Sequence, residues 1–158
     1  MKKLKKFAAL LLVGVMALAL LTACGGGGGS STNKAEEQKV MEQIGKEKGI
    51  SVASDAELRA VAERNLNEDL NAKIKILGYA GAFKFHTDRL EGDLVITITA
   101  RYDYKDTLLS DVLNKIYNYE DYNASVKQDG NWSNIGVVVQ SNNEQSYIGI
   151  SIRIKGKK

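Results

Sequence analysis

The chain has little of several residue types on which common protein chemistries depend. Its 158 residues include one cysteine and one histidine. One cysteine forms no intrachain disulfide, and one cysteine with one histidine is too few for a closed zinc site, which takes about four such ligands. No Gly-x-Ser-x-Gly motif places a serine nucleophile. These absences exclude a disulfide framework and a structural zinc site, and they argue against a serine hydrolase.

The composition limits the architecture to one folded domain. Hydrophobic residues make up 44% of the chain and charged residues 26%, which fits neither a disordered tail nor a protein with many membrane spans. A single hydrophobic core typically takes roughly 100–150 residues, so the chain has room for one domain at most.

The first 24 residues have the pattern of an export signal. Four lysines precede an uncharged segment, residues 7–21. This segment is shorter than the ~20 apolar residues of a membrane span, so residues 1–23 are predicted to be a signal peptide. They run into Leu21-Thr22-Ala23-Cys24, which resembles the lipobox of bacterial lipoproteins. The resemblance implies that diacylglycerol is attached to the Cys24 sulfur and that the chain is cut before Cys24. The alternative is an ordinary secretory signal that leaves a free thiol.

Lipidation predicts a protein anchored on the extracytoplasmic face of the cell membrane. Two acyl chains anchor a protein stably, at ~0.8 kcal/mol per buried methylene. Residues 24–33 then form the lipidated cysteine and a Gly/Ser tether of about 15–18 Å, and residues 34–158 form the domain. The five glycines of the tether have no following Lys-Ser or Lys-Thr, so they form no phosphate loop.

Removal of the signal peptide changes the charge balance. The signal holds four lysines and no acidic residue, so the formal net charge goes from +3 to −1, with 18 Lys and Arg against 19 Asp and Glu. No clustered basic surface is expected, and nucleic acid is therefore not predicted as a partner. The expected partners are the membrane, through the diacylglycerol on Cys24, and an envelope or extracellular ligand.

Apolar periodicity predicts three helices, over residues 33–49, 55–71 and 107–119. The first two begin at capping boxes, Asn33 with Glu36 and Ser54 with Glu57.

Strands are predicted in the second half of the chain. Apolar residues alternate with mostly polar ones over residues 94–104, which is typical of a strand. Residues 135–139 and 147–154 are predicted to form a hairpin, and Ile74 and Ile76 suggest one more strand. Helices that segregate around an antiparallel sheet make an α+β domain.

Several short strings resemble the CAP superfamily of cysteine-rich secretory and plant pathogenesis-related proteins. Residues 47–58 are similar to the junction between that family's first two helices. Residues 85–87 (Phe-His-Thr) resemble its Ser-His-Thr string, and residues 134–138 (Asn-Ile-Gly-Val-Val) resemble its Ile-Gly-Val-Gly strand. The resemblance covers residues 35–155. It implies a three-layer α-β-α sandwich around a mainly antiparallel sheet.

The resemblance also implies a central cleft. In that family two His and two Glu gather there and can hold a divalent metal or transfer protons. His86 takes the place of the first histidine, but the second is replaced by Tyr122, and one glutamate string falls near Thr97. Glu91 or Asp93 is the candidate for the other glutamate. The candidate cleft is therefore His86, Glu91, Asp93 and Tyr122. It has too few ligands for a metal centre, so no metal, cofactor or catalytic residue is predicted. His86 is alternatively a structural residue that makes one hydrogen bond.

Tyrosines are concentrated in one part of the chain, with the only tryptophan nearby. Three of them are expected in the core: Tyr102, Tyr104 and Tyr117. Tyr119, Tyr122 and Trp132 lie in a more polar stretch. They are predicted to form an exposed aromatic patch, of the kind enriched at binding surfaces.

Together these features predict a lipid-anchored extracytoplasmic binding or scaffolding domain without catalysis, whose ligand is a protein, a glycan or an apolar molecule. Two alternatives stay open. One is a metal-assisted hydrolase that uses His86 and a nearby carboxylate. The other is a protein-interaction module made of a duplicated unit, because a helix followed by strands is predicted in both 55–104 and 107–154.

Overall fold

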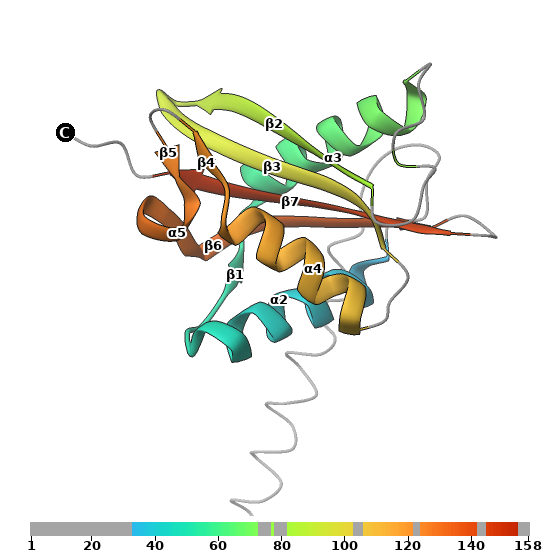
Figure 1. The fold of residues 1–158 in the computed structure, drawn as a ribbon, viewed down its shortest axis with the longest axis horizontal. Helices are drawn as coiled ribbons and strands as arrows, with labels where there is room; N and C mark the ends of the chain where they lie inside the picture. The colour runs from blue at the N-terminus through green and yellow to red at the C-terminus, as the bar shows by residue number, and fades with distance from the viewer. Residues whose placement is uncertain are drawn as a thin grey trace, which may run out of the picture.

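A five-stranded sheet organises the chain, with helices against both of its faces (Figure 1). The computed structural model of the protein describes residues 33–72, 77, 82–102, 106–121, 124–141 and 145–154, with the backbone alone for 106–108. In chain order the elements are α2 (Lys34–Lys48), β1 (Ala53–Ser54), α3 (Ala56–Asn71), β2 (Phe83–Leu90), β3 (Asp93–Tyr102), α4 (Asp106–Tyr117), β4 (Glu120–Asp121), β5 (Ala124–Ser125), α5 (Val126–Asp129), β6 (Gly130–Ser141) and β7 (Ser146–Ile154).

The strand order in the sheet is β1-β6-β7-β3-β2, and β4 pairs separately with β5. The short β1 runs parallel to β6, and the other pairs are antiparallel. The prediction of an α+β domain with a mainly antiparallel sheet is therefore confirmed. The finer assignment, a sandwich of the CAP type, stays a prediction.

Local capping explains where the first two long helices begin and end. The Asn33 side chain accepts a hydrogen bond from the Glu36 amide at 3.4 Å, and Gly49 ends α2 in the left-handed conformation, with φ +64°. The cap of α3 is Asp55, which accepts from two amides at 3.0 Å. The prediction that Ser54 caps this helix is wrong by one residue, because Ser54 pairs with Ile135 in the sheet.

The predicted strands are present: β3 lies at Asp93–Tyr102, and β6 and β7 are longer than expected. Strand β2 was not predicted. The hairpin of β6 and β7 extends over twelve and nine residues. The turn between β2 and β3 has positive φ at both Glu91 (+53°) and Gly92 (+93°), as a two-residue type I′ hairpin turn requires. The strand suggested by Ile74 and Ile76 lies outside the described residues, as does Tyr104.

The α2/α4 face of the sheet carries the larger core. Figure 1 shows α2 and α4 in front of the strands and α3 behind them. Side chains from alternate positions of the central strands pack here with the apolar residues of the two helices. The strand residues of this core are Ile96, Ile98, Ala100, Tyr102, Ile135, Val137, Val139, Ile148, Ile150, Ile152 and Ile154. Burial of this face is the main apolar contribution to folding.

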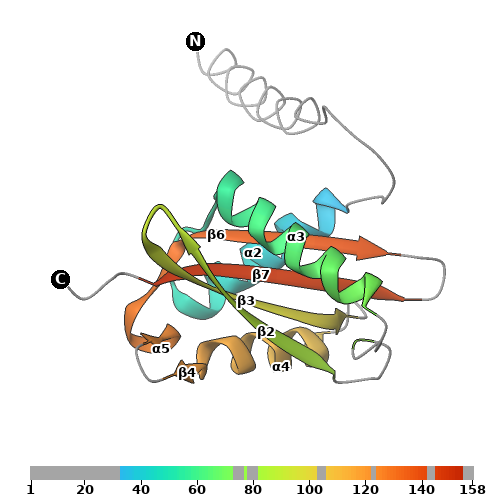
Figure 2. The ribbon, with the colours of Figure 1, turned by 90° about the horizontal axis from the view of Figure 1, so that it is seen from above.

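The α3 face is packed more closely and is more polar. Figure 2 shows α3 crossing β6 and β7. A Cβ at Gly136 would fall on the backbone of Leu58 and Arg59, so helix and strand meet there without an intervening side chain. Thr97 and Thr99 of β3 are fully buried beneath this helix.

Hydrogen bonds join the start of α2 to strand β6. The Asn33 amide donates to the Val139 carbonyl at 3.0 Å, and the Val139 amide donates to the Glu37 carboxylate at 3.3 Å. The same carboxylate pairs with Arg59 of α3 at 2.9 Å. The chain therefore enters the domain at a fixed position, near the C-terminal end of strand β6.

The two segments that suggested a duplication place their helices on opposite faces of the sheet. In 55–104, α3 covers one face, whereas in 107–154, α4 packs against the other. A two-fold repeat of one unit around the antiparallel β3–β7 pair would put both helices on the same face, so this arrangement does not favour the duplicated module.

Among the described residues, no helix has both the length and the apolar character that a membrane span needs. Cys24 and the predicted signal peptide lie outside the described residues.

Candidate functional site

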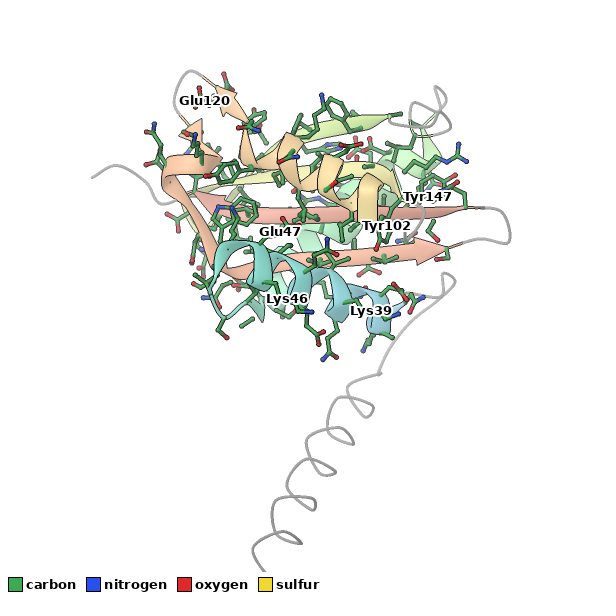
Figure 3. All side chains as sticks on the ribbon, turned by 60° about the horizontal axis from the view of Figure 1, so that its bottom comes forward. Lys39, Lys46, Glu47, Tyr102, Glu120 and Tyr147 are labelled. Atoms are coloured by element: carbon green, nitrogen blue, oxygen red, sulfur yellow. The ribbon has the colours of Figure 1, made fainter. Side chains whose placement is uncertain are left out.

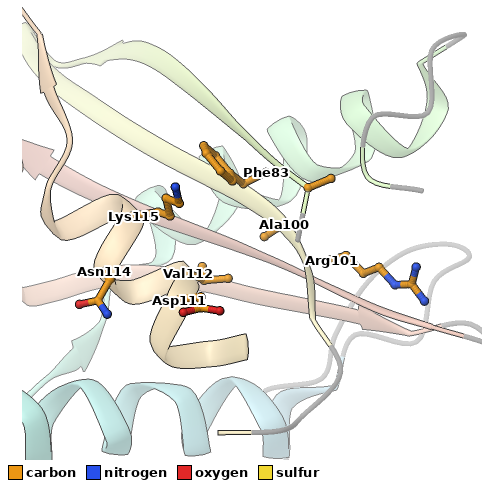
Figure 4. A pocket seen from close by; sticks show the side chains of 8 residues that line it. Phe83, Ala100, Arg101, Asp111, Val112, Asn114 and Lys115 are labelled. Carbon is orange, nitrogen blue, oxygen red and sulfur yellow. The ribbon is translucent and has the colours of Figure 1, made fainter. Parts of the chain in front are cut away.

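A pocket opens between the start of β2, the end of β3 and helix α4. Its volume is about 320 Å³. Phe83, Ala100 and Val112 give it an apolar floor, and the rim carries charged side chains from α4 and β3. Figure 4 shows Lys115 reaching from α4 toward Phe83, while Arg101 extends away from the helix. We call this hollow the β2–α4 pocket.

The rim of the β2–α4 pocket carries both signs of charge. Asp111 and Lys115 stand one turn apart on α4, and neither has an ion-pair partner within 4.0 Å among the described residues. The Lys115 Nζ lies 4.7 Å from the centroid of the Phe83 ring, which is close enough for a cation–π attraction. The pocket thus offers apolar surface beside Lys115 and Asp111, and Arg101 adds a second cationic residue to its lining.

A second cluster lies under α3, around the carboxylate of Asp69, which is 4% exposed. Its Oδ1 accepts from Lys84 Nζ at 2.6 Å, and its Oδ2 contacts His86 Nε2 at 2.6 Å and accepts from the Thr99 hydroxyl at 2.5 Å. Alternation along β2 explains the geometry, because Lys84 and His86 point to the same face of the sheet. We call these four residues the Asp69 network.

The electrostatics of the Asp69 network follow from its donors. Burial alone raises the pKa of Asp69, but the hydrogen bonds from Lys84, Thr99 and His86 outweigh burial and hold that pKa below its ordinary value. A charged carboxylate with three donors ties α3 to β2 and β3. Among the described residues, no hydroxyl is in hydrogen-bond contact with His86, so the pair has no serine or threonine to activate.

The three described residues of the predicted cleft, His86, Glu91 and Asp93, do not come together. Glu91 and Asp93 lie at the turn of the β2–β3 hairpin, where both pair with Arg153, at 3.6 and 3.2 Å. His86 lies farther along β2, opposite Thr97, and its acidic partner is Asp69. Tyr122 lies outside the described residues. The expectation that His86 makes a structural hydrogen bond describes this geometry better. No group of three or more His, Cys, Asp or Glu in the described part of the chain could hold a metal ion.

The predicted exposed aromatic patch is wrong for Trp132, whereas Tyr119 is half-buried and Tyr122 lies outside the described residues. Trp132 is only 8% exposed and belongs to the large core, and Tyr119 packs on Phe85 with 4.7 Å between ring centroids. The physical reason is an irregularity in β6, where the register with β7 shifts between Gly130 and Ile135. The irregular segment turns the indole inward although its sequence is polar.

Five important residues of these sites were not singled out from the sequence: Phe83, Asp111 and Lys115 of the β2–α4 pocket, and Asp69 and Lys84 of the Asp69 network. Asp69 sits between Glu68 and Leu70 near the end of a helix, where an acid is usually solvated. A signal was present, since the helical positions Leu58, Ala62 and Leu66 precede it on one face, and the series places Asp69 against the sheet.

No family model, curated protein or solved structure matches this chain.

Proposed function

We propose that this chain is a lipid-anchored, extracytoplasmic binding domain that takes a small amphipathic ligand in the β2–α4 pocket. The observation that carries the binding role is the pocket itself, a hollow of about 320 Å³ with an apolar floor. Ligand sites typically measure ~300–1,000 Å³ and combine apolar walls with a few polar groups. The floor suits the apolar body of such a ligand, and Lys115 or Asp111 suits its charged end.

The position of the pocket supports this proposal. Cross-strand pairing aligns Val139, Ile148, Ala100 and Phe83 in one row across the sheet. The chain enters the domain beside Val139, and the pocket lies at the other end of the row. Three strand spacings separate them, or about 14 Å. A ligand in the pocket therefore meets the domain on the side away from the tether.

The anchoring half of the proposal rests on the lipobox-like residues 21–24 and has its own test. Mass spectrometry of the native protein is expected to find a chain that begins at Cys24 and carries diacylglycerol. An unmodified chain that begins at Met1 would contradict the predicted location of the protein, and of its pocket, in the cell envelope.

The hydrolase alternative uses His86 with a nearby carboxylate, and the carboxylate in contact with His86 is Asp69, at 2.6 Å. The two acids considered from the sequence, Glu91 and Asp93, pair with Arg153 instead. The contacts of His86 support a structural role for the imidazole, because its Nε2 is held by a buried carboxylate that two other donors share.

The binding proposal is tested with two probes of opposite charge, octanoate and octylammonium, titrated calorimetrically into the full chain. Lys115→Met is expected to weaken octanoate binding about threefold and to leave octylammonium unchanged or tighter, because a partly exposed ion pair contributes up to ~1 kcal/mol. Asp111→Asn is the matched variant and is expected to have the opposite effect.

The apolar floor is tested with Val112→Thr, which keeps the shape of the side chain and adds a hydroxyl. It is expected to weaken both probes, since both bury their octyl chain on the same surface. If neither probe binds, or if all three variants bind both probes as the unmodified chain does, the β2–α4 pocket is not the ligand site.

A further inference from the structure

A lysine lies between two aromatic rings at the far end of the α2/α4 face. The Nζ of Lys48 is 3.8 Å from the centroid of the Tyr117 ring and 3.9 Å from that of Trp132. The two centroids are 6.0 Å apart, and the ring planes are inclined by 48°. An ammonium within about 6 Å of a ring centroid is attracted by the negative face of the ring. We call these three residues the aromatic clamp.

The rings of the clamp are held in place by the fold. Trp132 is buried, and its indole nitrogen donates to the Val126 carbonyl at 3.4 Å. Tyr117 is the last residue of α4 and packs against the large core. Lys48, in contrast, reaches the rings with a flexible side chain from the last residue of α2. The cation is therefore the replaceable part of the clamp, and the rings are the fixed part.

Space for a ligand adjoins the clamp. A hollow of about 230 Å³ lies between α2 and α4, lined by the three clamp residues with Ile44, Glu47, Leu113 and Asn114. Figure 3 brings α2 forward, with Lys39 and Lys46 on its outer side and Glu47 on the side toward α4. The hollow is separate from the β2–α4 pocket, although Asn114 lines both.

The surroundings of the Lys48 ammonium favour a different cation. Among the described residues, no oxygen accepts a hydrogen bond from its Nζ, and no carboxylate lies within 4.0 Å. Its three N–H donors therefore depend on solvent, and burial lowers the pKa of Lys48 although the charge of Glu47 acts in the other direction. A quaternary ammonium has no N–H donor to satisfy and meets the same two ring faces.

We propose that Tyr117 and Trp132 form a binding site for a quaternary ammonium group, and that Lys48 occupies this site until such a group displaces it. The ligand class follows from the two aromatic faces, the missing hydrogen-bond acceptors and the adjoining hollow. The site is independent of the proposed function, because it uses another hollow and no residue of the apolar floor of the β2–α4 pocket.

The test uses the fluorescence of Trp132, which is the only tryptophan of the chain. The full chain, purified in a maltoside detergent, is titrated with choline chloride at constant ionic strength. A saturable change in tryptophan emission is expected. The uncharged carbon analogue of choline, 3,3-dimethylbutan-1-ol, is expected to give none, because it has the same shape without the charge.

The variants separate the clamp from other surface lysines. Lys48→Met removes the cation that lies closest to both rings and is expected to tighten choline binding about tenfold, although the Nζ of Lys127 also lies 5.7 Å from the centroid of the Tyr117 ring. Lys46→Met is the matched control, since Lys46 is exposed on the outer side of α2, and it is expected to leave the choline affinity unchanged. Tyr117→Leu is expected to abolish the response. If Lys48→Met does not fold, as judged by circular dichroism, Lys48→Gln replaces it.

Three results would overturn the proposal. The first is an equal response to choline and to its uncharged analogue. The second is a choline affinity that Lys48→Met and Tyr117→Leu leave within twofold of the unmodified chain, and the third comes from the vesicle experiment. Binding to vesicles distinguishes the two possible sources of the quaternary ammonium group, a lipid headgroup and a soluble molecule. Binding to phosphatidylcholine over phosphatidylglycerol vesicles identifies a lipid headgroup, and a response to free choline alone identifies a soluble ligand. Both results support the clamp, and the absence of both overturns it.

Discussion

On the α2/α4 face of the sheet, aliphatic side chains from β3, β6 and β7 form one continuous core with two helices. On the α3 face, the buried apolar residues fall into two small clusters, and polar pairs lie beside them. These pairs include Asn65 with Asp88 at 2.7 Å and Thr97 with Ser151 at 2.7 Å, in addition to the Asp69 network.

The difference indicates a division of roles between the faces. Apolar contacts are strong in sum but not directional, so they stabilise the fold without fixing how a helix is rotated or shifted. Polar pairs have defined donors and acceptors, so the α3 face fixes the position of its helix. Both hollows described above open beside α4, on the face where apolar packing between two separate helices leaves gaps.

The sharpest test of this comparison uses two neighbours on β7 that point to opposite faces. Ile150→Ala, on the α2/α4 face, is expected to lower the free energy of unfolding by about 4 kcal/mol, because it leaves a cavity in the core. Ser151→Ala removes one buried hydrogen bond and is expected to lower it by about 1 kcal/mol. Urea unfolding of both variants checks the difference, and equal losses would break the comparison.

The next largest loss of unfolding free energy is expected where α3 closely approaches the sheet, at Gly136. Gly136→Ala is expected to lower the free energy of unfolding by about 3 kcal/mol, since the new Cβ meets the backbone of Leu58 and Arg59. Gly49→Ala is the matched control: nothing lies within 4 Å of its Cβ, and only its positive φ opposes the change. A loss of about 1 kcal/mol is expected there. If the two losses are alike, α3 can shift without a penalty.

Substitution in the Asp69 network is expected to cause a smaller loss of unfolding free energy, and this loss depends on pH. Asp69→Asn is expected to lower the free energy of unfolding by about 2 kcal/mol at neutral pH, because the charge that attracts Lys84 is lost.

The sign of the pH dependence follows from the pKa of Asp69. The native pKa lies below that of the unfolded chain, so the ionised carboxylate stabilises the fold above the unfolded pKa of about 3.9. This stabilisation is lost as the pH falls through the native pKa. In urea unfolding at several pH values, the gap between the unmodified chain and Asp69→Asn is expected to narrow below about pH 4. A gap that does not change with pH would show that the carboxylate is not charged in the folded state.

The smallest change in the free energy of unfolding is expected from loss of the ion pairs that Arg153 makes at the turn between β2 and β3. Arg153→Met is expected to change the free energy of unfolding by less than about 1 kcal/mol, because Glu57, Glu91 and Asp93 are well exposed and water competes for them. The measurement is urea unfolding at low and high salt, and the small loss is expected to vanish at high salt. A loss as large as that of Asp69→Asn would mean that the polar contacts at the turn are as strong as the buried ones.

The sequence predicted the elements whose signals are local. Asn33 and Gly49 mark the two ends of α2 because the cap and the left-handed residue are read from neighbouring positions. Strand β3 alternates apolar and polar residues, and that pattern needs no partner to be visible.

The parts that failed depend on contacts between distant residues. Strand β2 carries charged or polar residues on the face that α3 covers, and its turn uses Glu91-Gly92 in place of the Asn-Gly pair that signals a hairpin. His86 and Asp69 are separated by 17 positions, and no periodicity links a helix residue to a strand residue. The inward position of Trp132 depends on a register shift, which only the pairing with β7 produces.

The bonds that join Asn33 and Glu37 to Val139 have a mechanical consequence. A pull at Asn33 is transmitted to strand β6, which pairs with β7 continuously over residues 135–141, and through Glu37 to Arg59 on the opposite side of the sheet. The load is thus divided over several elements before the first helix can unravel. The contacts at the start of α2 therefore resist tension applied to the domain at Asn33.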